Sequence, residues 1–340
     1  MLFFTGSYTD RGGPAHQPQG LGITSCFFDS TNGTIKISGS TFQKNPSYPI
    51  LSKDKKVLYA ANETFATEEP QLVAYSVNED GSLSQLNAVP LKGDFSCHMA
   101  IAGQSLIIAN YVSGDILVYS LRPTGEIDRL CQQIFHEGSG PNKERQEAPH
   151  PHMIFPVNDS FFYCVDLGID AAKAYGCDSA SQKWKPLPEH DIKVKAGAGA
   201  RHMDTYGEWI ALLGELSGEL FLYRRTADSF QLIDVASLDE GAMDTAAIRF
   251  HPNGKFIYCS DRKTNCIHGY MIAENKLNPI GKIVSGGKTP RDISIDSTGK
   301  WLLAANQNSN TIAVFSIDYI TGALQYINMY IVMTPSAICW

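Results

Sequence analysis

The chain has 340 residues, 43% of them hydrophobic, and a formal net charge of −7 at pH 7. This composition allows a large buried core, whereas the acidic balance and the lack of a basic stripe argue against nucleic-acid binding, which needs many Lys and Arg on one face. No run of about 18 apolar residues occurs and the N-terminus lacks the pattern of a secretion signal, so we expect a cytoplasmic protein without a membrane span.

A short passage returns seven times along the chain. In each copy a polar residue opens an apolar run, a turn follows, and a second apolar run ends at Asn, Asp or Gly. The copies are spaced by 44 to 54 residues, which is typical of solenoids and propellers. They open at Pro46-Ser47, Cys97-His98, Pro151-His152, Arg201-His202, Thr245-Ala246, Pro290-Arg291 and Pro335-Ser336.

The apolar runs inside each repeat are predicted to be β-strands. They are short and rich in β-branched and aromatic residues, as at 256–259 and 312–315, and Asn-Gly, Asp-Gly and Thr-Gly turns separate them. No repeat contains the i, i+3, i+4, i+7 spacing of a helix. Four strands per repeat make one propeller blade, so we predict an all-β, seven-bladed β-propeller with four antiparallel strands per blade, forming a single domain over residues 1–340.

The last repeat is incomplete, and the N-terminal segment supplies the strands that it lacks. Residues 334–340 hold one strand, whereas 2–4, 22–28 and 34–37 read as three strands without an innermost partner. We therefore expect the C-terminal strand to join the N-terminal blade and close the ring, which removes an open sheet edge. Two longer excursions, 9–20 and 136–149, are predicted to be either solvated loops or a lid over a pocket.

Cysteine, histidine and glycine patterns give no reason to expect a metal or a cofactor. Several of the eight cysteines, such as Cys164, Cys259 and Cys339, lie inside apolar runs, which predicts reduced thiols. His150 and His152 form a candidate metal pair, but no third ligand or Cys-x-x-Cys pair accompanies them. The glycines at 197 and 199 lack the G-x-G-x-x-G spacing, and a G-x-S-x-G nucleophile is absent, so chemistry here would use activated water.

Hairpin geometry gathers polar residues at one mouth of the ring, because the first strand of each repeat starts where the second ends. Like charges gathered at low dielectric cost energy unless an anion relieves them, so we expect this mouth to bind a small anionic molecule. The alternatives are hydrogen bonds to the next blade for the histidines, ion pairs for the arginines, and a turn role for asparagine. The candidate residues are Ser47, Glu63, His98, Asn110, Tyr111, His152, Arg201, His202, Glu215, Arg262, Arg291, Gln307 and Ser336.

Six passages spread over nearly the whole chain carry a resemblance to a known family. They are Asn45-Pro46-Ser47-Tyr48-Pro49, Ala109-Asn110-Tyr111-Val112-Ser113-Gly114, Pro149-His150-Pro151-His152-Met153, Gly199-Ala200-Arg201-His202-Met203, Phe250-His251-Pro252-Asn253-Gly254-Lys255, and Thr289-Pro290-Arg291-Asp292 with Ala305-Asn306-Gln307. On these passages the chain resembles the seven-bladed propeller type of 6-phosphogluconolactonase. It is also similar to the fungal carboxy-cis,cis-muconate lactonizing enzymes.

The resemblance implies hydrolysis of a sugar lactone, foremost 6-phosphogluconolactone, without a cofactor. By position, the family's catalytic residues correspond to His152, Arg201, Glu215 and Arg291. Glu215 or His152 would be the general base, and the two arginines would hold the oxyanion or the phosphate. We expect the substrate contacts to come from Ser47, His98, Asn110, Tyr111, His202, Arg262 and Gln307.

The sequence departs from the family pattern in two places and leaves other functions open. Asp292 follows Arg291 where the family usually has His, and Gly199-Ala200 stands where Gly-Pro is common, which puts the identity of the lactone in question. Two alternatives remain at this point. One is a non-catalytic propeller that binds a protein or a metabolite, and the other is lactonization of a muconate-like diacid with the same arginines on its carboxylates.

Overall fold

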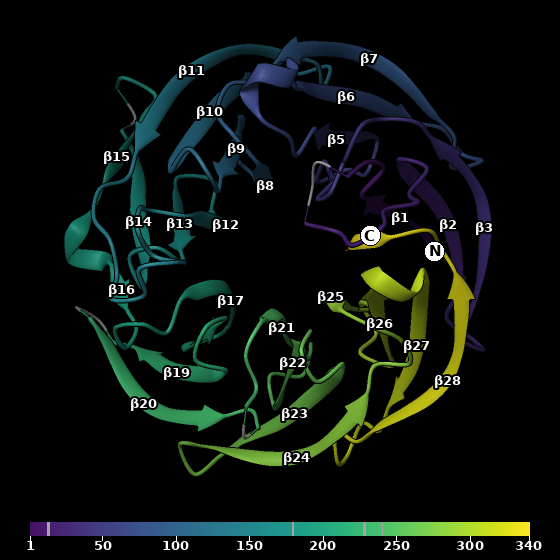
Figure 1. Cartoon of the computed structure of the whole chain (residues 1–340), viewed down its shortest axis with the longest axis vertical. Coiled ribbons are helices and arrows are strands. Elements are labelled where there is room, and N and C mark those ends of the chain that lie inside the picture. Colours follow the sequence, from purple (N-terminus) through teal and green to yellow (C-terminus); the bar gives the residue numbers. More distant parts are fainter. Residues whose placement is uncertain (12–13, 179, 227–228, 240) are drawn as a thin grey trace.

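The computed structural model describes residues 1–11, 14–178, 180–226, 229–239 and 241–340. Within these ranges, seven antiparallel sheets stand around a central axis (Figure 1). Each sheet runs through four strands from the axis outward, and the fourth sheet has one further short strand. The predicted seven four-stranded blades are therefore confirmed.

Blade 1 joins the two ends of the chain. From the axis outward its strands are β29 (Pro335–Cys339), β1 (Leu2–Ser7), β2 (Ile23–Asp29) and β3 (Thr34–Thr41). The ring of Trp340 lies 5.0 Å from that of Phe3, and its Nε1 donates a hydrogen bond of 2.7 Å to Ser294 Oγ of the neighbouring blade. The expected closure of the ring by the C-terminal strand is confirmed.

The next three blades follow in sequence order. Blade 2 contains β4 (Ile50–Leu51), β5 (Val57–Ala61), β6 (Gln71–Val77) and β7 (Leu83–Pro90). Blade 3 contains β8 (Ser96–Ala102), β9 (Ser105–Asn110), β10 (Asp115–Leu121) and β11 (Ile127–Phe135). Blade 4 contains β12 (Pro151–Asn158), β13 (Phe161–Asp166), β14 (Ala171–Asp178), β15 (Lys183–Pro186) and the short β16 (Ile192–Lys193), which pairs with β14.

The remaining blades complete the circle. Blade 5 contains β17 (Ala200–Tyr206), β18 (Trp209–Gly214), β19 (Glu219–Arg225) and β20 (Phe230–Ser237). Blade 6 contains β21 (Thr245–Phe250), β22 (Phe256–Asp261), β23 (Cys266–Ala273) and β24 (Lys276–Val284). Blade 7 contains β25 (Pro290–Ile295), β26 (Trp301–Asn306), β27 (Thr311–Ile317) and β28 (Leu324–Ile331).

Apolar side chains fill the space between neighbouring blades. The inner strands read as continuous apolar runs because both of their faces are covered, and β26 is buried at every position. The outer strands alternate between covered and exposed side chains, as β11 does. The core is therefore a series of layers between blades. In one of them Phe162 and Tyr175 of blade 4 pack with Ile116 of blade 3.

The cysteines and the helical segments concern two further expectations, reduced thiols and the lack of a membrane span. All eight cysteines are free, and Cys164 and Cys259 are buried in β13 and β22. In the described part of the chain the helical segments are three 3₁₀ turns, η1 (Ala66–Glu68), η2 (Pro188–His190) and η3 (Gln307–Ser309). No helix there is long and apolar enough to cross a membrane.

Deleting residues 335–340 should leave β1 with an unpaired edge and make the protein self-associate, because β29 is its only inner partner in blade 1 as described. Size-exclusion chromatography should show larger species for the truncated chain. The matched control is Trp340→Ala, which keeps the ladder and should lower the free energy of unfolding by only about 0.5–3 kcal/mol. A truncated chain that elutes and unfolds like the control would contradict this account of closure.

Candidate active site

An extra residue stands at the start of nearly every innermost strand. In β12, Pro151 pairs with Asp166 and Met153 with Val165, so His152 has no partner of its own in the ladder. Such a β-bulge re-aims the unpaired side chain. We call the side of the ring where the innermost strands begin the front face. In the described strands, equivalent bulges occur at Cys97, His152, Arg201, Ala246–Ala247, Arg291 and Ser336.

A left-handed residue precedes most of these strands. Two positions before the bulged residue the backbone has a positive φ, as at Thr289 (60°) before Arg291 and Phe95 (56°) before Cys97. Residues other than glycine rarely adopt a positive φ, so its recurrence shows that the fold constrains the backbone at the front face. In blade 5 the position is Gly199, where a Cβ would approach Leu216 Cγ to 2.5 Å and glycine is therefore required.

A second ring of side chains follows the ends of the second strands. The backbone N–H of Glu215 donates to the carbonyl of Gly199 at 2.8 Å, and that of Gln307 donates to Thr289 at 2.9 Å. This repeated bond fixes the residue after each second strand beside the start of the first. The residues so placed are Tyr8, Glu63, Tyr111, Leu167, Glu215, Arg262 and Gln307.

The two rings enclose a cavity of about 360 Å³ at the front face, which we call the front cavity. This volume suits a small molecule. Its walls combine bulged residues with second-strand ends and with parts of both long loops. The lining residues are Pro14, Glu63, Phe95, Cys97, Tyr111, Val112, Arg145, His152, Arg201, Glu215, Arg262 and Arg291.

Glu215 is a buried carboxylate that pairs with three guanidiniums. Arg201 Nη1 donates to its Oε2, Arg262 Nη2 lies 3.2 Å from the same oxygen, and Arg145 Nη2 donates to Oε1 at 2.6 Å. Burial by itself raises the pKa of Glu215, but Arg201, Arg262 and Arg145 together outweigh it and hold the pKa well below its ordinary value. Glu215 is therefore ionised at neutral pH and resists taking up a proton.

Arg291 differs from the other three arginines of the cavity. Its guanidinium lies over the ring of Tyr8, 5.2 Å from the ring centre, and makes no ion pair or hydrogen bond within the described residues. Tyr8 in turn donates its hydroxyl to Glu63 at 2.8 Å. Among the described lining residues four guanidiniums therefore meet two carboxylates, which leaves the cavity with a formal excess of positive charge in an acidic protein. An anion would relieve this excess.

Three buried histidines lie close to one another at the axis. The ring centres of His152 and His202 are 5.3 Å apart, and those of His98 and His202 are 5.7 Å apart. Burial, followed by nearby guanidiniums, lowers the pKa of His98 to about 3 and the pKa values of His152 and His202 well below the ordinary value. All three imidazoles are therefore neutral at pH 7, and in the empty cavity His152 takes up a proton less readily than an ordinary histidine.

The structure brings seven of the predicted site residues together in the front cavity: Glu63, Tyr111, His152, Arg201, Glu215, Arg262 and Arg291. Ser47 and His202 line a small neighbouring enclosure, which His152, Arg201 and Arg291 also line. Asn110 and Gln307 do not line the front cavity. Asn110 accepts from Ser96 and donates to Asp115, as a structural residue does, and Gln307 donates to Asn308.

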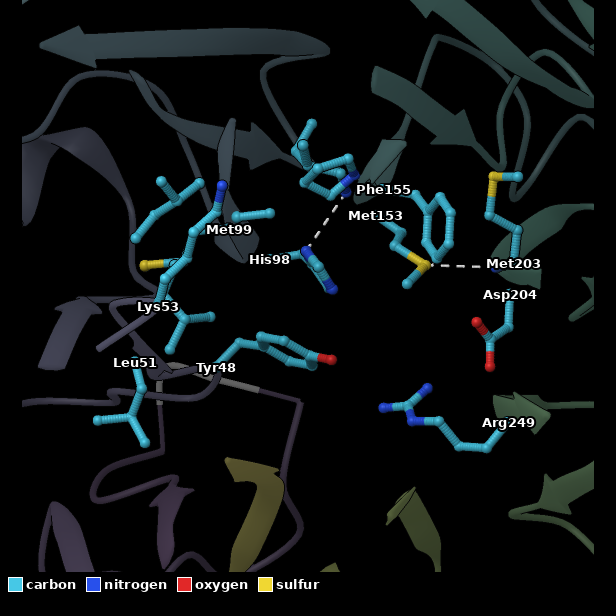
Figure 2. A pocket seen from close by; sticks show the side chains of 15 residues that line it. Tyr48, Leu51, Lys53, His98, Met99, Met153, Phe155, Met203, Asp204 and Arg249 are labelled. Carbon is cyan, nitrogen blue, oxygen red and sulfur yellow. Dashed lines mark hydrogen bonds between the residues drawn. The ribbon is translucent and has the colours of Figure 1, made fainter. Parts of the chain in front are cut away.

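His98 faces the opposite end of the channel. It lines a second cavity of about 400 Å³ at the back face, where the innermost strands end, and Figure 2 shows it above Tyr48, whose hydroxyl points toward Arg249. The ring centres of Tyr48 and His98 are 4.0 Å apart. The reason is the register of β8: its bulged residue is Cys97, so the next residue turns away from the front face.

Five lining residues are outside the predicted set: Pro14, Phe95, Cys97, Val112 and Arg145. Cys97 has the position that His152 has in blade 4, and burial raises the pKa of its thiol, so it is an apolar wall and not a nucleophile. Phe95 is the left-handed residue of blade 3. Arg145 lies in the 136–149 excursion, whose wholly buried Gln146 bonds to Leu167 and Asp170, so part of this loop is a fixed wall of the cavity. The length of the 136–149 loop was the only sign in the sequence that it could contribute to the site.

The described residues contain no group of three His, Cys, Asp or Glu side chains arranged to hold a metal ion. His150 does not join His152 in a metal pair, because its Nδ1 lies 2.8 Å from the Tyr111 carbonyl and its ring stacks on that of Tyr111. A ligand in the front cavity would therefore contact hydrogen-bonding and charged side chains.

Comparison with known proteins identifies the family. Residues 3–340 match the family described as lactonase, 7-bladed beta-propeller. The chain is 32% identical over 323 residues to the probable 6-phosphogluconolactonase of Arthroderma benhamiae, covering 88% of this chain and 81% of that protein. It is 28% identical over 349 residues to the 6-phosphogluconolactonase of Formosa agariphila, covering 98% and 97%.

A solved structure agrees with these relatives. A Bacteroides fragilis protein, proposed to be a 6-phosphogluconolactonase, has a TM-score of 0.89 and 27% identity over 99% of this chain and 96% of its own. The chain belongs to the seven-bladed lactonase family. The predicted enzyme class, a lactonase that hydrolyses lactones, is thereby confirmed.

Acid should destabilise the fold through the buried histidines. Unfolded histidines take up protons below about pH 6.5, whereas His98 in the fold does so only near its pKa of about 3, so the free energy of unfolding falls as pH falls through this window. Each such group contributes about 1.4 kcal/mol per pH unit. Urea unfolding of wild type and His98→Gln at pH 7, 6 and 5 should show a shallower fall in the variant. Equal slopes would contradict a neutral, buried His98.

Proposed function

We propose that this lactonase hydrolyses a phosphorylated aldonolactone, 6-phosphogluconolactone, in the front cavity, with His152 as the general base. The observation that carries the proposal is the unpaired guanidinium of Arg291 in a cavity whose other three guanidiniums already share Glu215. A dianionic phosphate would supply the counter-charge that this cavity lacks. The names of the relatives from Arthroderma benhamiae and Formosa agariphila support the same substrate.

The choice of base follows from what surrounds the two groups, because the pKa values of both Glu215 and His152 lie below their ordinary values. Three guanidiniums hold the pKa of Glu215 low, so its carboxylate has little affinity for the proton of an attacking water. His152 is neutral, lines the cavity, and has no ion pair within the described ranges. An anionic substrate would screen the nearby arginines and raise the proton affinity of His152 when the substrate is bound. His152 is therefore the better base.

The reaction then needs one water and one proton shuttle. The water oxygen bonds to the lactone carbonyl carbon as His152 removes its proton, and the carbonyl oxygen becomes an oxyanion. The bond from that carbon to the ring oxygen breaks next, and His152 returns the proton to the departing ring oxygen. The products are the open-chain carboxylic acid and neutral His152, so atoms and charges balance.

Glu215 and its partners hold the donors in place. Arg201 is fixed twice, by Glu215 and by a 3.1 Å bond from its Nε to the Ala246 carbonyl, and it occupies the bulge next in the ring after His152. A donor fixed before reaction stabilises a developing oxyanion most effectively. We therefore assign the oxyanion to Arg201 and the phosphate to Arg291. Glu215 acts as a positioning residue through Arg201.

Replacing Arg291 should separate phosphorylated from unphosphorylated lactones. Because a charged hydrogen bond contributes about 1.5–3 kcal/mol, Arg291→Ala should lower kcat/KM for 6-phosphogluconolactone by about 10-fold to 100-fold and change that for glucono-δ-lactone much less. Lactone hydrolysis is followed by acid release, with the uncatalysed rate subtracted. Arg122→Ala, which removes a surface ion pair to Asp128, is the matched control.

Two results would count against the proposal. Equal losses with both lactones would remove Arg291 from phosphate binding. Absence of turnover with either lactone in wild type would reject the substrate class.

Removing the imidazole of His152 should abolish most of the rate. A general base contributes about 10²-fold to 10⁴-fold, so His152→Ala should lower kcat by that factor, and added imidazole should restore part of it. Initial rates with saturating substrate are measured with and without imidazole, and circular dichroism verifies the fold. A loss smaller than threefold would exclude His152 as the base and return Glu215 to consideration.

A further inference from the structure

A small enclosure adjoins the front cavity, with which it shares lining residues, and we call it the axial enclosure. Its volume is about 10 Å³, which matches the space that one buried water needs. Cys97, His152, Arg201 and Arg291 line both this enclosure and the front cavity. The complete lining is Ser47, Tyr48, Cys97, His152, Arg201, His202, Arg291 and Ser336.

Three lining residues have buried polar atoms without a hydrogen-bond partner. They are Ser47 Oγ, His152 Nδ1 and His202 Nδ1, on side chains that are 3%, 5% and 3% exposed. An unsatisfied buried polar atom costs about 1–3 kcal/mol, so three around one enclosure need a common explanation. Ser336 is not a fourth such atom, because its hydroxyl donates to the Ser47 carbonyl at 2.7 Å.

We propose that the axial enclosure binds one structural water that bridges Ser47, His152 and His202 and thereby orients His152 for catalysis. This inference rests on the proposed function for its catalytic part only. The water accepts hydrogen bonds from His152 Nδ1–H and Ser47 Oγ–H and donates one to His202 Nδ1. Three polar partners are the usual number for a buried water, and all three unpaired atoms become satisfied.

The charges of the front cavity decide which nitrogen of His152 has the proton. All three guanidiniums that act on the imidazole of His152 line the front cavity, those of Arg201, Arg262 and Arg291, whereas only Arg201 and Arg291 also line the axial enclosure. A lone pair facing guanidiniums is favoured over an N–H group facing them, so Nε2 is left unprotonated toward the substrate and the proton lies on Nδ1. The water at Nδ1 then orients His152 as the carboxylate orients the histidine of a serine hydrolase triad. Ser47 and His202 hold this water and are therefore positioning residues.

Tyr48 separates this water from the back face. Its side chain lines both the axial enclosure and the back cavity. Its ring centre lies 4.0 Å from that of His98, with the two rings tilted, and Figure 2 shows the pair in the back cavity. Burial raises the pKa of its phenol, so it stays neutral. Tyr48 is therefore a wall that the axial enclosure shares with the back cavity.

Two measurements on the wild-type protein test the water itself, independently of any activity. A crystal structure should show one ordered water within about 3.2 Å of Ser47 Oγ, His152 Nδ1 and His202 Nδ1. Nitrogen NMR of the ¹⁵N-histidine-labelled protein, with His152 assigned by comparison with His152→Gln, should show the proton on Nδ1 and the lone pair on Nε2. No density in the enclosure, or a proton on Nε2, would overturn the proposal.

A variant tests the consequence for catalysis. Ser47→Ala should lower kcat by about threefold to tenfold, which is the loss of one neutral hydrogen bond, and leave KM unchanged, while part of the His152 population moves to the Nε2–H tautomer. Ser25→Ala, which removes a buried hydroxyl from β2, is the matched control and should change neither readout. An unchanged tautomer and kcat in Ser47→Ala would overturn the positioning role. If wild type hydrolyses neither lactone but the water and tautomer are observed, the proposed function fails and the water site stands.

Discussion

One extra residue at the start of an innermost strand determines which side chains meet at the front face. The bulge interrupts the ladder, so that residue turns into the channel while the strand beyond it resumes its alternation. His152, Arg201 and Arg291 come from three blades and more than a hundred residues of sequence, yet they hold equivalent positions. The geometry of the candidate site is therefore a property of the repeated backbone, and these three blades contribute different side chains to it.

The charge balance of the cavity depends on a single carboxylate. Glu215 neutralises part of the charge of Arg145, Arg201 and Arg262, and without it three guanidiniums would be crowded in a partly buried space. The same pairing makes Glu215 a weak base and leaves Arg291 as the cation without a partner among the described residues. Structure and chemistry thus constrain each other: in the proposed mechanism, the carboxylate that stabilises the site takes no part in proton transfer, and an imidazole has that role.

Sequence periodicity was enough to predict the seven blades, their strand content and the closure by β29, because blade length and turn residues repeat along the chain. The ends of the second strands were also predictable, which located Glu215 and Arg262. The register of the first strands was not. The repeat openings Cys97-His98 and Pro151-His152 group His98 with His152, whereas the bulges make Cys97 the equivalent of His152. Arg145 was missed because a loop residue has no place in a repeat.

The pairing of β29 with β1 has a consequence for how the protein is made. The two partners are at opposite ends of the sequence, so β1 leaves the ribosome nearly a whole chain length before its inner neighbour exists. Six blades can assemble during translation, but the seventh sheet must wait with an open edge. Closure of the ring is then a late event of biosynthesis. Until β29 has been made, the open edge of β1 is the part of the nascent chain that most needs protection by a chaperone.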